Sequence, residues 1–287
     1  MLACYTIRMA FSFFSKQRGA LQVLLVDIGS ASVGVALARL QKNKEPHIIA
    51  THRESIPFQG MLSSSRFLLA MNQSLEVALK HVHLELKGAT PPKHVFCSLS
   101  SPWFILKNRS ICIEQTTAFK VTEKNLYNFL DEDIALLKDE IKEAFPIKDV
   151  ALVEKKIIQI KLNGYEVQNP YGRMTSQLEA VAVLSLSSKK VITSIEQKIG
   201  KFFHTKSLHF GAFPIALFSA IRDIFPEEKN FIFLDVTGEA TDVSYVKNDL
   251  IIDTQSFHCG KNFFIREIST YFKTHETEAA TLFKMFL

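Results

Sequence analysis

Apolar residues form two similar patterns near opposite ends of the chain. The first, LLVDIGSASVGVAL at 24–37, has two apolar runs around a centre rich in glycine and serine. The second, FIFLDVTGEATDVSYV at 231–246, repeats this arrangement. Aliphatic and β-branched runs on both sides of a tight turn are typical of two paired strands. The pattern therefore predicts a strand pair at 22–37 and another at 231–246.

Helical and extended periods divide most of the remaining chain. Apolar residues recur close to every 3.6 residues at 64–87, which predicts an amphipathic helix. Thr122 can cap another long helix at 123–143. Further helices are expected at 188–203, within 207–225, from about 261 and from near Thr277. Strands are expected at 47–57, 94–101, 104–115, 150–167, 178–187 and 250–257, with 94–101 and 104–115 paired through Ser101-Pro102-Trp103.

Breaks rich in proline, glycine or charge suggest the boundaries of structural units. They fall at 88–92 and 226–230. We expect a basic leader at 1–20, a discontinuous first subdomain at 21–92 and 181–228, an inserted α/β unit at 93–180, and the start of a second subdomain at 229–287. The last predicted helix is rich in apolar residues, so either the sequence is a fragment or this face meets a partner.

Composition indicates a globular protein in a reducing compartment. The 287 residues are 47% hydrophobic and 22% charged, and the four cysteines form no CxxC pair. We therefore expect a cytoplasmic protein without a structural metal site. The basic residues of the leader follow its apolar part, which is the wrong order for export. If Met9 is the start, the leader MAFSFFSKQRG could touch a membrane surface.

Charge and scattered histidines exclude several functions. The formal net charge of +5 is spread along the chain, and no basic stripe is interleaved with aromatic residues. Nucleic-acid binding is therefore not expected. The nine histidines form no metal-binding spacing, and no GxSxG motif or Cys/His pairing indicates a hydrolase.

The strand-turn-strand patterns carry the residues with a chemical use. Gly29 lets the backbone approach a ligand, and successive N–H groups of such a turn can form a nest for a phosphate. Ser30 adds a hydroxyl, and Asp27 can hold a metal-bound water. A single hairpin of this kind is usually only a turn, but its recurrence around Asp235 indicates a duplicated domain that holds a nucleotide between its halves.

Both hairpins resemble the phosphate motifs of the actin, Hsp70 and sugar-kinase superfamily. The unit at 93–180, the stretch KLNGYEVQNPYGRMTSQLEAVAVLSL and the segments FLDVTGEATDVSYVKNDLIIDTQSFHCGKNFFIREI and THETEAATLFK resemble FtsA-type proteins and their relatives PilM. The resemblance implies an α/β, actin-like ATPase (ribonuclease H-like) fold with an inserted 1C-type subdomain and an incomplete second half. It implies ATP with Mg²⁺ at Asp27, Gly29, Ser30, Asp235, Gly238, Thr241, Gly260 and Lys261.

The sequence departs from that family at several of its phosphate positions. Ser32 stands where many FtsA sequences have lysine, and Thr237 replaces a glycine. Glu239 would repel a triphosphate unless a cation offsets its charge. Lys261 takes the place of a second glycine, where it could restore a positive charge or simply face solvent, and Ile265 replaces a threonine. The adenosine-binding glycine pair would lie beyond residue 287. These departures predict that nucleotide binding is weakened or lost.

Three functions remain open from the sequence. The first is an FtsA-like scaffold that docks an FtsZ-like tail at the cytoplasmic face of the membrane in cell division, with self-association through the inserted unit. The second is a PilM-like pilus-assembly component with a PilN-like partner. The third is an active ATPase or sugar-kinase-type enzyme, which the weakened phosphate motifs disfavour.

Overall fold

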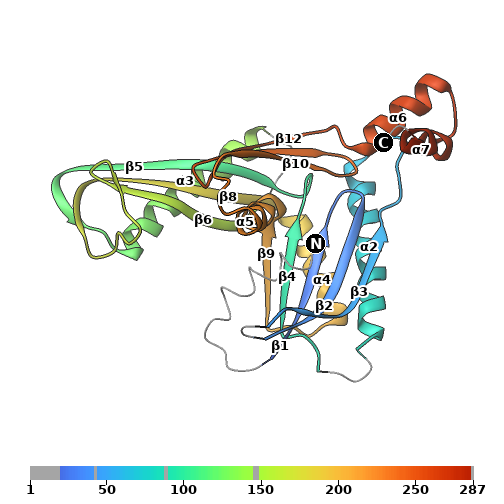
Figure 1. The fold of residues 1–287 in the computed structure, drawn as a ribbon, viewed down its shortest axis with the longest axis horizontal. Helices are drawn as coiled ribbons and strands as arrows, with labels where there is room; N and C mark the ends of the chain where they lie inside the picture. The colour runs from blue at the N-terminus through green and yellow to red at the C-terminus, as the bar shows by residue number, and fades with distance from the viewer. Residues whose placement is uncertain (1–19, 42–43, 87–89, 145–148, 286–287) are drawn as a thin grey trace.

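The computed structural model describes residues 20–41, 44–86, 90–144 and 149–285. In this part of the chain the strands form three sheets, and the sheet formed within residues 105–188 extends to the left of the view in Figure 1. We call the three the first sheet, the inserted sheet and the second sheet. The leader predicted at 1–20 lies outside the described residues except for its last position.

The first sheet has the strand order β3-β2-β1-β4-β9. β1 (Leu21–Ile28) and β2 (Ser32–Leu40) form the predicted antiparallel hairpin, and β3 (His47–Ser55) adds to β2. α2 (Ser64–Leu84) packs on β2 and β3 and against α4 (Lys189–Phe202). The apolar side of α2 is buried, as its period predicts; it includes Met71, Leu75 and Leu79.

One predicted pairing is wrong. β4 (His94–Leu99) does not pair with the strand that follows it; it lies parallel to β1 on one side and to β9 (Ser207–Ala212) on the other. β4 is therefore a strand of the first sheet, although the predicted boundary at 93 assigned it to the inserted unit. The neighbours of a parallel strand come from distant parts of the sequence, which a local apolar pattern does not identify.

The inserted sheet has the order β5-β8-β6-β7. β5 (Ile105–Lys120), β6 (Val150–Leu162), β7 (Tyr165–Glu166) and β8 (Met174–Ser188) are antiparallel neighbours. α3 (Glu123–Ala144) covers one face, and the Thr122 hydroxyl accepts the Asn125 amide, as expected of its cap. β6 ends at the predicted turn, where Asn163 and Gly164 both have positive φ.

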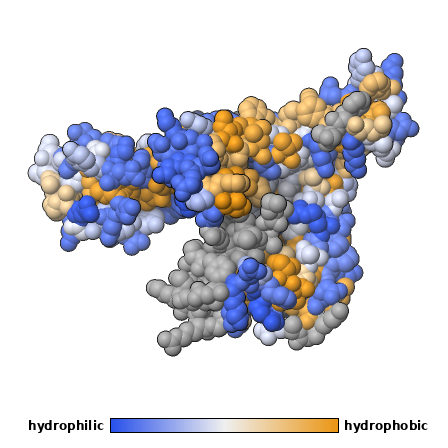
Figure 2. All heavy atoms as spheres, viewed as in Figure 1, coloured by the Kyte–Doolittle hydropathy of each residue, from blue (hydrophilic) through white to orange (hydrophobic). Residues whose placement is uncertain are grey.

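The second sheet contains the second predicted hairpin. β10 (Phe231–Val236) pairs with β11 (Thr241–Lys247), and β12 (Leu250–Phe257) pairs with β11. α5 (Phe213–Ile224) precedes this sheet, and α6 (Lys261–Phe272) and α7 (Glu276–Met285) follow it. Ile232, Leu234 and Val236 of β10 are each about 60% exposed, and Figure 2 shows apolar atoms gathered over this region.

The last helices form a pair beside the first sheet. α6 and α7 pack together, and Phe264 stacks on Phe283 with ring centroids 6.0 Å apart. Part of the apolar side of α7 is thus buried within the chain, while Met285 is 75% exposed. No helix in the described ranges is both long and apolar enough to cross a membrane.

Candidate functional site: the cleft between two hairpin turns

The first hairpin places Asp27 at the end of β1 and closes its turn with a backbone bond from Gly29 N–H to Ser32 C=O at 3.1 Å. Arg53 of β3 lies across this hairpin. Its guanidinium donates to Asp27 Oδ2 at 2.7 Å and to Ser32 Oγ at 2.8 Å. A Cβ at Gly34 would lie 2.6 Å from the Arg53 Nη2 atom, so the glycine makes room for the guanidinium. Arg53 therefore supplies a cation beside Asp27 in a chain that lacks lysine at Ser32.

The pKa of the Asp27 carboxyl reflects two opposed influences. Burial raises this pKa, and the hydrogen bond and charge of Arg53 lower it. Burial is the larger influence, so the carboxyl has a pKa above its usual range despite its basic partner.

The turns of the two hairpins contact each other directly. The Thr237 hydroxyl donates to the Ala240 carbonyl at 2.7 Å, so the Ser30 hydroxyl is the donor in its 2.6 Å bond to Thr237 Oγ1. Ser30 Oγ in turn accepts the Glu239 N–H at 2.9 Å. Each of these groups is thus satisfied by another protein group, and the two predicted phosphate turns are joined.

Gly238 and Gly260 make this close approach possible. A Cβ at Gly238 would lie 2.7 Å from the Ser30 carbonyl oxygen, and one at Gly260 would lie 2.4 Å from the Gly238 carbonyl oxygen. Gly260 is the N-cap of α6, whose first amides donate from Lys261 to the Thr237 carbonyl and from Asn262 to the Gly238 carbonyl. In this arrangement the two glycines bring protein backbone together.

Glu239, at the tip of the second hairpin, is 5% exposed. Its Oε1 accepts from Asn262 Nδ2 at 2.8 Å, and its Oε2 accepts from Arg266 Nη2 at 2.5 Å. Arg266 also donates to the Gln59 carbonyl at 3.1 Å and lies over the Phe58 ring. The charge of Glu239, expected to repel a phosphate, is therefore compensated by an arginine of α6.

Two further acidic residues, Asp235 and Asp242, lie on the strands on either side of the second turn. Asp235 is opposite Asp242 in the β10–β11 register. Asp242 is 1% exposed, and its Oδ1 accepts from the hydroxyls of Ser101 and Ser256 at 2.6 and 2.5 Å. Asp235 Oδ2 and Asp242 Oδ2 are buried without a hydrogen-bond partner in the described structure. Burial, followed by the charges of Asp242 and Asp27, raises the pKa of Asp235 to about 6.

The loop that leaves β4 connects the hairpins with the inserted sheet. The Trp103 indole N–H donates to the Gly29 carbonyl at 2.8 Å, and the ring stacks on Phe67 with centroids 5.0 Å apart. The Ser187 hydroxyl of β8 donates to the Trp103 carbonyl at 2.6 Å. Trp103 is 6% exposed, so its ring packs within the fold.

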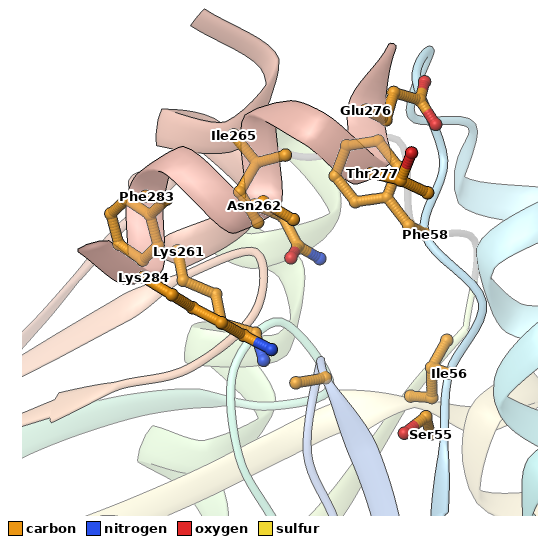
Figure 3. Close-up of a pocket in the computed structure, with 12 residues that line it drawn as sticks. Ser55, Ile56, Phe58, Lys261, Asn262, Ile265, Glu276, Thr277, Phe283 and Lys284 are labelled. Carbon is orange, nitrogen blue, oxygen red and sulfur yellow. The ribbon is translucent and has the colours of Figure 1, made fainter. Parts of the chain in front are cut away.

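A pocket of about 450 Å³ opens beside the joined turns. Its walls come from the end of the first hairpin, the segment after β3, and helices α6 and α7 (Figure 3). The side chains of Lys261 and Lys284 point the same way at one side of it, and Ile56, Phe58 and Ile265 supply apolar surface. The volume is within the range of small-molecule sites.

Several donors that the phosphates of the predicted ATP would use between the turns are already bonded to protein groups in this arrangement. Side-chain oxygens of Ser30 and Thr237 are within hydrogen-bond distance, and the amides of Glu239, Lys261 and Asn262 already donate to protein oxygens. Among the described residues, no group of three or more His, Cys, Asp or Glu side chains could hold a metal ion. The two turns therefore contact each other within the chain, at the place where a phosphate would need free hydrogen-bond donors.

The structure brings the predicted site residues together. Ser30 lies against Gly238, which lies against Gly260, the charges of Asp27 and Asp235 act on each other, and Lys261 lines the pocket. Gly29 lies in the first turn, where its carbonyl accepts from Trp103. Thr241 points elsewhere in the hairpin and donates to the Cys259 carbonyl at 2.6 Å. Sequence reasoning missed Arg53 and Arg266. Gly34 within a strand was a possible signal for Arg53, because glycine there indicates close approach.

Comparisons with known proteins support the fold. No protein-family model and no curated protein matches the chain. A chain of the PilM–PilN type IV pilus biogenesis complex matches 91% of this chain over 69% of its own length, with 16% identity and a TM-score of 0.59. MreB5 of Spiroplasma citri bound to ADP matches 91% of this chain and 61% of its own, with 11% identity and a TM-score of 0.41.

A protein from Bacteroides thetaiotaomicron with an actin-like ATPase fold matches 88% of this chain and 78% of its own, with 10% identity and a TM-score of 0.42. The chain has the α/β, actin-like ATPase fold expected from its sequence, and the similarity that supports this fold is the one to the pilus-complex chain, with its TM-score of 0.59. At these identities the likeness concerns the fold alone.

Proposed function

We propose that the chain is an actin-like scaffold that docks a protein partner, with a PilN-type cytoplasmic tail as the partner, at the inner face of the cell membrane. The observation that carries this proposal is an apolar hollow where the first and inserted sheets meet, in a chain with the fold seen in the PilM–PilN complex. In this role the closed cleft holds the scaffold together and the hollow receives the partner.

The hollow has a volume of about 60 Å³, enough for part of one apolar side chain. Trp103 and Phe104 form one wall, Ile141 and Val150 another, and Val191 of α4 a third. Ser187 and Ser188 at the end of β8 are the polar residues in its lining. An apolar pocket with a few polar groups suits the anchor residue of an extended peptide.

A binding experiment tests the partner. The full chain is titrated against a fluorescent peptide of the cytoplasmic tail of the PilN-type protein from the same genome, and fluorescence anisotropy is measured. We expect saturable binding, weakened at least tenfold by Val150→Asp, which places a charge at the partly exposed wall of the hollow. Asp253→Asn, on the exposed side of β12, is the matched control and should leave binding unchanged.

An FtsZ tail peptide in the same assay separates the pilus role from the division role. Binding of the FtsZ peptide alone would replace the proposed function with the FtsA-like one. Failure of both peptides to bind the wild-type chain would refute docking through this hollow. Unchanged binding by a folded Val150→Asp variant would refute it as well.

A further inference from the structure

The buried Glu239 carboxylate lies at the start of α6, where a helix attracts negative charge. The first turn of a helix carries a partial positive charge and free amides, which is why anions often bind there. Here the carboxylate accepts from Asn262 Nδ2 in the first turn and from Arg266 in the next. Both Glu239 oxygens therefore have donors from α6, and the carboxylate is 5% exposed.

These bonds belong to a network that crosses between the two halves of the chain. On one side, Ser30 Oγ accepts the Glu239 N–H at 2.9 Å and Ser30 donates to Thr237. On the other, Arg266 holds Glu239 and donates to the carbonyl of Gln59 in the first half. We call Ser30, Thr237, Glu239, Asn262 and Arg266 the cleft latch. Its two crossings join the first hairpin turn, at Ser30, and the segment after β3, at Gln59, to the second half.

We propose that Glu239 is a built-in anion of the cleft, which holds the two halves together and excludes phosphate-bearing ligands from the turns. Glu239 supplies the negative charge that Arg266 and the start of α6 require, so a phosphate would have to displace a buried carboxylate that has charge-assisted hydrogen bonds. Glu239 is thus a specificity-determining residue, because its carboxylate occupies the side-chain donors of Asn262 and Arg266 on α6.

Thr237 has a matching role on the other side of the latch. Its hydroxyl accepts the Ser30 proton and donates its own to Ala240, so both hydroxyls at the contact between the turns are used internally. A glycine at 237 would remove this acceptor, and the Glu239 N–H would then be the contact that Ser30 keeps within the latch. The two departures from small residues, at 237 and 239, therefore act together to close the same cleft.

The test compares the wild-type chain with Glu239→Gln, which keeps the shape and the acceptor for Asn262 and removes the charge. Glu267→Gln, an exposed residue of α6 that changes the net charge equally, is the matched control. Hydrogen exchange measured by mass spectrometry should show the 237–240 backbone protected in wild type and in Glu267→Gln. We expect exchange at least tenfold faster in Glu239→Gln.

Calorimetry with inorganic pyrophosphate, and separately with ATP and Mg²⁺, tests exclusion. We expect no binding at millimolar concentration to wild type or Glu267→Gln, and measurable binding to the Thr237→Gly/Glu239→Gln double variant. Wild-type binding at the turns, shown by added protection of 237–240, would overturn the proposal, as would rapid exchange of these amides in free wild type. Neither readout depends on the partner peptide, so a failure here is distinguishable from a failure of the docking proposal.

Discussion

Asp235 is expected to destabilise the folded chain at neutral pH. Its carboxylate is opposite Asp242 on a paired strand, and its Oδ2 atom is buried without a hydrogen-bond partner in the described structure. Directly opposed like charges on neighbouring strands are unfavourable, and burial adds to the cost of the charge. The substitution Asp235→Asn removes the charge with almost no change in shape, so it should stabilise the fold.

The magnitude follows from the pKa of the carboxyl. Folding raises this pKa from 3.8 to about 6, so the folded chain holds the proton more tightly than the unfolded chain. The free energy of unfolding therefore falls as the pH rises from about 4, and the loss is complete above about pH 6 to 7. At about 1.4 kcal/mol for each pKa unit the full penalty is about 3 kcal/mol, and partial exposure of the carboxylate reduces it to about 1–2 kcal/mol.

Urea denaturation of wild type, Asp235→Asn and the exposed control Glu267→Gln measures this effect. At pH 7.5 Asp235→Asn should be more stable than wild type by about 1–2 kcal/mol, and this advantage should shrink by more than half at pH 4.5. Glu267→Gln should stay within about 0.5 kcal/mol of wild type at both values. An Asp235→Asn chain that is no more stable at pH 7.5, or whose advantage does not change with pH, would refute the reasoning.

Three further changes have clear expected results in the same assay. Arg53→Met removes the cation beside Asp27 and should lower the free energy of unfolding by about 1–3 kcal/mol. The loss should be larger at pH 8 than at pH 5, because the uncompensated carboxyl takes up a proton in acid. A loss that does not vary with pH would contradict this. Trp103→Phe keeps an aromatic ring beside Phe67 but removes the donor to the Gly29 carbonyl. We expect the free energy of unfolding to fall by about 1 kcal/mol. An unchanged urea midpoint would show that this hydrogen bond contributes nothing to stability. Leu75→Ala, at a fully buried site on α2, should cost about 2–5 kcal/mol, and a loss below 1 kcal/mol would mean that the helix does not pack as described.

Most elements were predictable because their signals are local. The period of α2, the cap at Thr122 and the turn at Asn163-Gly164 each involve residues a few positions apart, and the structure confirms all three. The position of β4 is different, since its neighbours β1 and β9 lie far from it in sequence on either side. Its local pattern showed a strand but contained nothing about the sheet to which that strand belongs.

The same distinction applies to the cleft. Recurrence of an acidic residue followed by glycine and small residues between two apolar runs identified both turns, and the structure brings these turns into contact. The direct bond between Ser30 and Thr237, the pairing of Glu239 with Arg266, and the approach of Arg53 to Asp27 all depend on tertiary placement. Sequence reasoning therefore identified Glu239 as a charge that needs a cation, but it could not identify which residue supplies the cation.

The two hairpins show how copies of one motif can place their acidic residues beside different neighbours. In the first, Arg53 reaches Asp27 because Gly34 leaves space for its guanidinium, and the acid has a cation within hydrogen-bond distance. In the second, the acid is opposite Asp242, whose Oδ1 is bonded to hydroxyls, and burial of both carboxyls raises both pKa values. Arg266 of α6 is used at Glu239. Because Arg53 and Arg266 compensate different acids, the first hairpin has a cation at its strand residue Asp27, and the second has one at Glu239 in its turn, where the two halves are joined.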